Sequence, residues 1–292
     1  MRRTEQLVRR SAAVLAVLAL GATTAACESD GPPASAQAAA VAVAPLKYAA
    51  LGDSYASGEG APPYDSGPTS CKRSDRSWAK RLDADSAGIA SVDHRACSGA
   101  KTVNLTAAWA DRGFAAQIPS PPDPSITLVT VVVGGNDVGF GDIVAACVIW
   151  LCPSPTDRGF TGRLTTLKST LQAQLYPALK AAYPNARIAH VGYPRITPPS
   201  SVRPRSCLWL SSSDQKSATG IVDKLNSTIQ SATQGKGITY VDVGAALAGH
   251  EMCTAAPWVR GIGDDGQAHP TADGQRAIEK VVATALGIPI PA

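Results

Sequence analysis

A serine that could act as a nucleophile stands directly after the first strand-like segment. Residues 48–52 are short and apolar, and the tetrapeptide GDSY at 52–55 places Ser54 on the turn that follows them. A tight turn after a buried strand can present a hydroxyl group, and a nearby helix N-terminus would stabilise negative charge on a bound group. The same residues could equally cap a helix, and the sequence contains no G-x-S-x-G motif.

Two further turns carry groups that could stabilise a developing negative charge. Residues 126–133, ITLVTVVV, predict a strand buried on both faces, and Asn136 follows them in GGND. The side-chain amide of Asn136 could donate to an oxyanion. Gly99, in ACSGA at 96–100, follows a second candidate strand and could bring its backbone N–H close to a ligand. Taken singly, both segments also fit ordinary glycine-rich turns.

His269 is the histidine that the sequence best places to act as a base. It lies in the polar, glycine-rich segment GDDGQAHPTADG, just before the last predicted helix, whereas His190 lies in an apolar strand and is expected in the core. The match to G-x-G-x-x-G at 261–266 predicts a loop rather than a dinucleotide site, because no strand leads into it and the next helix begins only after Pro270. With no H-E-x-x-H and no C-x-x-C, the sequence predicts no metal site.

The segments that must position these residues alternate between strand and helix patterns. Alternation of this kind predicts a parallel sheet with helices on both faces, in which functional groups lie beyond the carboxyl ends of the strands. Leucines at spacings of three and four between 164 and 179 predict one amphipathic helix that ends near Pro184. The other segments are strands at 48–52, 126–133, 187–193 and 238–243, and helices at 77–87, 214–233 and 271–286.

The N-terminal residues predict export. Four arginines and one glutamate in the first ten residues precede an uncharged apolar run at 11–22, which is too short for a stable membrane span. We expect residues 1–26 to be a signal peptide, residues 27–45 a low-complexity linker and residues 46–292 the folded domain. Thr24-Ala25-Ala26-Cys27 resembles a lipobox, although leucine is usual where Thr24 stands, so lipidation of Cys27 is expected and an ordinary secretory cleavage is the alternative.

The net charge and the short apolar runs exclude two classes of protein: those that bind nucleic acid and those that span a membrane. Residues 1–26 carry a net charge of +3, so their removal lowers the formal charge of the 292-residue chain from +4 to +1. That charge leaves no basic surface for nucleic acid. No later apolar run approaches about 20 residues, so we expect membrane contact only through an N-terminal lipid. The length suits one large α/β domain.

Four blocks in fixed order give the strongest functional signal. GDSYASGEG, CSGAKT, GGNDVGF and AHPTADG together resemble the SGNH, or GDSL-type, serine esterase and lipase family, particularly its secreted actinomycete members. The resemblance covers residues 46–290. It implies a three-layer α/β/α sandwich with a flavodoxin-like, doubly wound parallel sheet. It also implies hydrolysis of carboxylic esters, from small-molecule or lipid substrates, with no cofactor and no metal.

The resemblance assigns a role to each candidate residue. Ser54 corresponds to the nucleophile and His269 to the general base, while the Ser54 N–H, the Gly99 N–H and the Asn136 amide correspond to the oxyanion donors. The sequence departs from the family at one position, because Gly266 stands where the family usually has an aspartate. Either Asp265 or a backbone carbonyl near Gly266 must then orient His269, and we favour the carbonyl.

The seven cysteines fit an exported protein. If Cys27 carries a lipid, six remain, and six cysteines in an oxidising compartment can form three bridges in 15 possible pairings. The family resemblance, rather than the spacing, implies the pairs Cys71–Cys97, Cys147–Cys152 and Cys207–Cys253.

Other functions remain open at this point. The main alternatives are a carbohydrate O-deacetylase of the same fold and a non-catalytic, solute-binding surface lipoprotein. The solute-binding protein would not need Ser54 and His269 together. A purely structural surface protein would leave the four blocks unexplained. For the esterase or lipase we expect a monomer that is exported and either secreted or held at the cell surface as a lipoprotein.

Overall fold

The computed structural model describes residues 44–65, 71–148, 152–202, 207 and 210–291. These residues belong to one folded unit, Val43–Ala292. The predicted signal peptide, Cys27 and nearly all of the predicted linker lie outside the described residues. In the described part of the chain, no helix is both long enough and apolar enough to cross a membrane.

A five-stranded parallel sheet forms the centre of the unit. The strands are β1 (Leu46–Gly52), β2 (Ile89–His94), β3 (Leu128–Val132), β4 (Arg187–Val191) and β5 (Thr239–Val241). Their order across the sheet is β2-β1-β3-β4-β5, and every neighbouring pair is parallel. This is the flavodoxin-type doubly wound order, in which successive strands are added to one side of β1 and then to the other, so that the switch point lies between β1 and β3. The predicted fold class is therefore confirmed.

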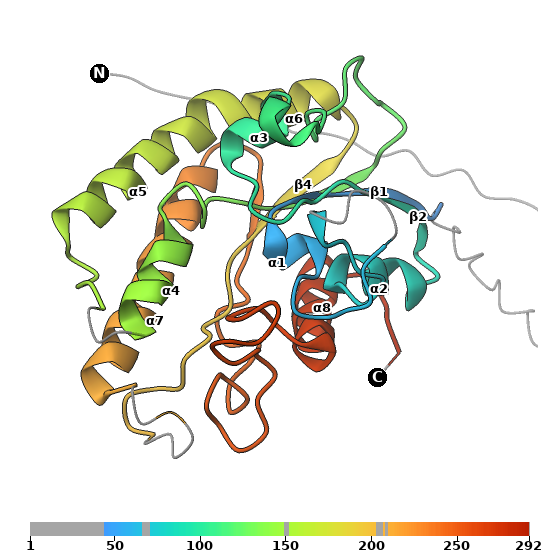
Figure 1. Cartoon of the computed structure of the whole chain (residues 1–292). Helices are drawn as coiled ribbons and strands as arrows, with labels where there is room; N and C mark the ends of the chain where they lie inside the picture. The colour runs from blue at the N-terminus through green and yellow to red at the C-terminus, as the bar shows by residue number, and fades with distance from the viewer. Residues whose placement is uncertain (1–43, 66–70, 149–151, 203–206, 208–209, 292) are drawn as a thin grey trace, which may run out of the picture. The chain divides into compact units, whose positions relative to one another are not determined.

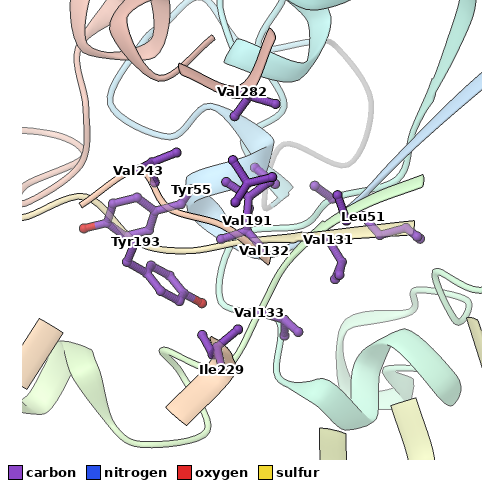
Figure 2. Packing of buried hydrophobic residues seen from close by; sticks show 14 of the residues in the cluster. Leu51, Tyr55, Val131, Val132, Val133, Val191, Tyr193, Ile229, Val243 and Val282 are labelled. Carbon is purple, nitrogen blue, oxygen red and sulfur yellow. The ribbon is translucent and has the colours of Figure 1, made fainter. Parts of the chain in front are cut away.

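Helices cover both faces of the sheet (Figure 1). One face carries α1 (Ser54–Ser57), α2 (Trp78–Ala84) and α8 (Ala272–Leu286), and the other carries α3 (Thr102–Thr106), α5 (Arg158–Thr170), α6 (Tyr176–Ala182) and α7 (Ser212–Thr233). A further helix, α4 (Phe140–Val148), follows β3 and packs against α7. In Figure 2, Val282 of α8 and Ile229 of α7 lie on opposite sides of the strands.

The central strand is buried because helices cover it on both faces. Residues 128–132 of β3 are each at most 1% exposed. Val131, Val132 and Val133 pack with Leu51 and Val191 in the middle of the sheet (Figure 2). The uncharged, β-branched run at 126–133 correctly predicted this environment.

Side-chain hydroxyl groups fix the starts of the predicted helices. Ser77 begins α2, Ser211 begins α7 and Thr271 begins α8, and each hydroxyl accepts a backbone N–H three residues later. Such N-caps satisfy donors that a helix start leaves without partners. The helices therefore begin within two residues of the predicted positions.

The leucine-rich segment is not the single regular helix that its spacing predicts. All five leucines, Leu164, Leu167, Leu171, Leu175 and Leu179, are buried as expected, but a π-helical turn at Leu171–Leu175 separates α5 from α6. Pro177 stands at the start of α6 and has no backbone N–H to donate. In a regular α-helix its ring would also clash with the carbonyl four residues earlier, and the wider π turn relieves that conflict.

The register of the sheet gathers the predicted site residues at one edge. Gly52 pairs with Val132, so β1 and β3 end side by side. Ser54 follows β1 and Asn136 follows β3, while Gly99 lies on the loop after β2. All three therefore lie beyond the carboxyl ends of the strands, at the switch point where open α/β sheets bind ligands.

Three disulfides join Cys71 to Cys97, Cys147 to Cys152 and Cys207 to Cys253, the same pairs that the family resemblance implies. The first and third close loops of 26 and 46 residues, so each contributes about 3–4 kcal/mol in the chain-entropy model. The Cys71–Cys97 bridge ties the segment before α2 to the loop that carries Gly99.

Candidate active site

Ser54 is the first residue of α1, and the preceding residue, Asp53, fixes the turn on which it lies. The Asp53 carboxylate caps the helix by accepting the Tyr55 N–H at 3.0 Å, and it also accepts the Tyr193 hydroxyl at 2.6 Å. Burial raises the pKa of Asp53 to about 7, against the lowering effect of these two hydrogen bonds. The rings of Tyr55 and Tyr193 meet edge to face at 5.2 Å (Figure 2). The turn that carries Ser54 thus rests on packed side chains from the segments that directly follow β1 and β4.

The chain brings His269 to Ser54 across a separation of 215 residues. His269 Nε2 lies 2.7 Å from Ser54 Oγ, and His269 Nδ1 lies 2.8 Å from the carbonyl oxygen of Gln267. A carbonyl can only accept, so Nδ1 carries the proton in the neutral ring and Nε2 is left to accept from the serine hydroxyl. The centroid of the Tyr55 ring lies 4.9 Å from that of the imidazole, and the Tyr55 hydroxyl donates to the Ala268 carbonyl at 2.8 Å.

The environment of His269 favours the neutral imidazole. Its side chain is 18% exposed. Burial lowers the pKa of His269, and the Glu59 carboxylate opposes that effect. A neutral imidazole with a free lone pair on Nε2 is the form that can remove a proton from a hydroxyl group.

A main-chain carbonyl, rather than Asp265, contacts the second nitrogen of His269. The carbonyl belongs to Gln267, the residue after Gly266. The Asp265 side chain is 76% exposed and pairs with Lys72 at 3.2 Å. Asp264 accepts the backbone N–H of Gly261 at 2.8 Å and so closes its own loop. The sequence allowed either Asp265 or a backbone carbonyl to orient His269. The structure contains the arrangement with the carbonyl.

Close packing of two loops explains why residue 266 has no side chain. Gly266 has a φ of +75°, and a Cβ on it would lie 2.8 Å from the Cα of Gly60. A Cβ on Gly60 would lie 2.6 Å from the Pro270 carbonyl oxygen. The loop that follows Ser54 and the loop that carries His269 therefore touch backbone to backbone, and no aspartate fits at 266 without separating them.

Gly99 and Asn136 line the same cleft as Ser54 and His269, which encloses about 380 Å³. The Asn136 amide donates one hydrogen to the Ala100 carbonyl at 3.0 Å, and its NH₂ group has a second hydrogen to offer. Arg112 donates to the Ser98 carbonyl at 2.9 Å, which, with the Cys71–Cys97 bridge, holds the loop of Gly99. The four residues singled out from the sequence thus meet at one cleft.

Two residues in the cleft were not singled out from the sequence. Tyr193 follows β4 and anchors Asp53. Glu59 lies in the GDSYASGEG block, and its Oε2 is 3.8 Å from His269 Nε2. A glutamate among small residues directly after the nucleophile turn is the signal that could have identified it. Nothing in the sequence pattern marks Tyr193.

Two other histidines have structural surroundings. His190 is fully buried between the Tyr176 hydroxyl and the Val133 carbonyl, as expected, and His250 stacks on Trp258. Among the residues that the structure describes, no group of three or more His, Cys, Asp or Glu side chains could hold a metal ion. Residues 261–266 form turns of the loop that carries His269.

Comparison with known proteins places this geometry in a family. Residues 50–277 match the model of the GDSL-like lipase/acylhydrolase family. A lipase from Streptomyces rimosus is 34% identical over 248 residues, which are 83% of this chain and 87% of that protein. The chain therefore belongs to the GDSL-like lipase/acylhydrolase family and is a carboxylic ester hydrolase of the SGNH type.

Two solved structures share the fold over nearly their whole length. The extracellular lipase from Streptomyces rimosus superposes with a TM-score of 0.65 at 29% identity, covering 82% of this chain and 99% of that one. Phospholipase A1 from Streptomyces albidoflavus NA297 superposes with a TM-score of 0.63 at 32% identity, covering 83% and 100%. Together with three disulfides, which persist in oxidising compartments, the extracellular relative indicates export.

We predict that Gly266→Asp lowers activity instead of completing a triad. The new side chain would collide with Gly60 and push the histidine loop away from Ser54, so kcat should fall by at least about tenfold, equivalent to about 1.4 kcal/mol of barrier. Steady-state kinetics on a soluble ester measures this, with thermal unfolding as the control for stability. A variant as active as the unmodified protein would contradict the account of this loop contact.

Proposed function

We propose that Ser54 and His269 hydrolyse esters as a catalytic dyad. The observation that carries the proposal is the contact of 2.7 Å between Ser54 Oγ and His269 Nε2, in a ring whose Nδ1 faces the Gln267 carbonyl. Serine alone is a weak nucleophile and needs a positioned base to take its proton. The Gln267 carbonyl fixes the tautomer of His269 but adds no full negative charge.

The reaction then has two halves. Ser54 Oγ attacks the ester carbonyl carbon as its proton passes to His269 Nε2, and the tetrahedral intermediate collapses when that proton moves to the departing alkoxide. An acyl-enzyme on Ser54 remains. Water attacks its carbonyl, again losing a proton to His269, and the acid product leaves as Ser54 recovers its hydrogen.

Three donors would stabilise the negative oxygen of each tetrahedral intermediate. These are the backbone N–H groups of Ser54 and Gly99 and the free hydrogen of the Asn136 amide. Their positions directly after β1, β2 and β3 support this role, because the three residues line the same cleft. Fixed donors aimed at developing charge are a large contribution to such catalysis.

We infer that the acyl group of the substrate is a fatty acid. Phe140 and Val144 lie one turn apart on α4 and line both the catalytic cleft and an adjoining narrow apolar pocket of about 30 Å³. Other large apolar side chains also line that pocket, among them Ile196, Leu210, Ile221 and Met252. An apolar wall that leads away from the nucleophile suits an alkyl chain. The relatives named lipase and phospholipase A1 support the same substrate class.

A panel of esters with graded acyl length tests the substrate class. We expect kcat/KM to rise from acetyl esters to esters with longer alkyl chains, since each buried CH₂ contributes about 0.8 kcal/mol. The Ser54→Ala variant measures the background rate for each ester. A maximum at acetyl esters, and especially at acetylated carbohydrate, would favour the O-deacetylase instead.

Substitution of the proposed base, His269, and of the candidate orienting residue Asp265 tests the dyad. His269→Ala should abolish measurable turnover. Asp265→Ala should cost less than about tenfold in kcat, or about 1.4 kcal/mol of barrier, because its carboxylate contacts Lys72 rather than the imidazole. A loss near 10⁴-fold for Asp265→Ala, comparable to removal of the carboxylate from a full triad, would show that Asp265 is the third member.

For the N-terminal region, we propose export followed by anchoring. Residues 1–26 would be a signal peptide, Cys27 the lipid-modified first residue of the mature chain, and residues 27–45 the linker to the catalytic domain at 46–292. Two or more acyl chains give stable membrane attachment, whereas one alone does not. The enzyme would act there as a monomer.

A further inference from the structure

We propose that Glu59 is a positioning residue that places a negative charge beside His269 on the Nε2 side of the ring, and so assumes part of the electrostatic role of the absent triad aspartate. The inference rests on the proposed roles of Ser54 and His269. In a full triad the carboxylate lies at Nδ1. Here a carbonyl occupies that side, and the carboxylate approaches from the other.

Three contacts fix the Glu59 side chain. Its Oε1 accepts the Lys72 ammonium at 2.6 Å, and its Oε2 accepts the Ser98 hydroxyl at 2.5 Å. The same Oε2 lies 3.8 Å from His269 Nε2. The side chain is only 12% exposed, so water screens the charge weakly. Because Ser98 precedes Gly99, the carboxylate also connects the base to the oxyanion loop.

The charge acts at the moment when His269 becomes positive. Transfer of the Ser54 proton to Nε2 creates an imidazolium, and an opposite charge within 4–6 Å favours that form. Because Glu59 is held before the reaction begins, it need not reorganise during the proton transfer. Burial alone would disfavour the imidazolium, so the carboxylate offsets a cost that the closed site imposes.

Other charged groups also lie around His269. Lys72 opposes the imidazolium, although its ammonium is shared between Glu59 and Asp265. Asp53 lies beneath the nucleophile turn and is bound by Tyr193 and the Tyr55 N–H.

On the histidine loop, Asp264 binds a backbone N–H of its own loop and Arg260 donates to the Gly60 carbonyl at 2.8 Å. Of the carboxylates in the described ranges, Glu59 is the one within 4 Å of an imidazole nitrogen.

Glu59 stays ionised where the enzyme would work. Burial by itself would raise the pKa of its carboxyl group, but His269, Lys72 and Ser98 together bring that pKa below its ordinary value. In turn the carboxylate raises the pKa of His269 against the larger lowering effect of burial. Removal of this charge must therefore lower the pKa of His269.

The decisive variant is Glu59→Gln, which keeps the shape and can still accept from Ser98. We expect the acid limb of the kcat/KM profile to move to lower pH by about 0.5–1 unit. The plateau above that limb should fall by about tenfold, because the imidazolium in the transition state is less stabilised. The control Asp265→Asn removes a carboxylate that contacts Lys72 but not the imidazole, and its acid limb should stay in place.

A direct titration separates this inference from the proposed function. The imidazole signals of only four histidines can be followed by NMR in the inactive Ser54→Ala background. We expect the added Glu59→Gln change to lower the pKa of His269 there, whatever the catalytic rates show. Glu59→Asp, which draws the charge back by one methylene, should give an intermediate shift and serves as the second variant if glutamine prevents folding.

A loss of activity with an unmoved acid limb and an unmoved His269 pKa would overturn the proposal, since that result would leave Glu59 with a purely structural role. Full activity in Ser54→Ala alone would instead contradict the proposed nucleophile. The two failures are therefore distinguishable.

Discussion

The contact between Ser54 Oγ and His269 Nε2 is the interaction on which the site depends. It joins loops that are 215 residues apart in the chain, so neither loop can create it alone. The sheet order brings the Ser54 turn to the switch point beyond β1 and β3, and α8 brings the histidine loop back to it. Backbone contact between Gly60 and the histidine loop sets the distance between the two side chains. A side chain on Gly60 or on Gly266 would push the two loops apart.

Two other groups take over the role of the aspartate that this close approach of the loops excludes. Because Gly266 cannot carry an aspartate, Nδ1 of His269 donates to the Gln267 carbonyl, which fixes the ring without a full charge. The negative charge comes instead from Glu59, which lies on the Nε2 side of the ring, where the proton is transferred. Asp53 has a different task, because its hydrogen bonds to the Tyr55 N–H and the Tyr193 hydroxyl hold the turn that carries Ser54. The site thus divides the tasks of one triad carboxylate between a carbonyl and a glutamate.

Much of this arrangement follows from patterns that are local in the sequence. The apolar strand at 126–133, the capped helices and the turns with Ser54, Gly99 and Asn136 each have a short-range signal, and parallel topology then brings the strand ends together. The π turn before Pro177 was not foreseen, because the leucine spacing records which face is buried rather than the width of the helix. The absence of aspartate at 266 was visible in the sequence, but the contact with Gly60 that causes it was not. Glu59 stands out locally as a glutamate among small residues, but its contact with His269 joins distant loops. No local pattern marks Tyr193, whose contact with Asp53 is also long-range.

The most direct test of the account is a covalent label on the nucleophile. A fluorophosphonate should react once with the folded protein, and tandem mass spectrometry of its peptides should locate the adduct on Ser54. His269→Ala should suppress the labelling rate, because the hydroxyl then has no base at 2.7 Å to take its proton. An adduct on another serine, or labelling at the same rate without His269, would contradict the claim that these two residues form the reacting pair.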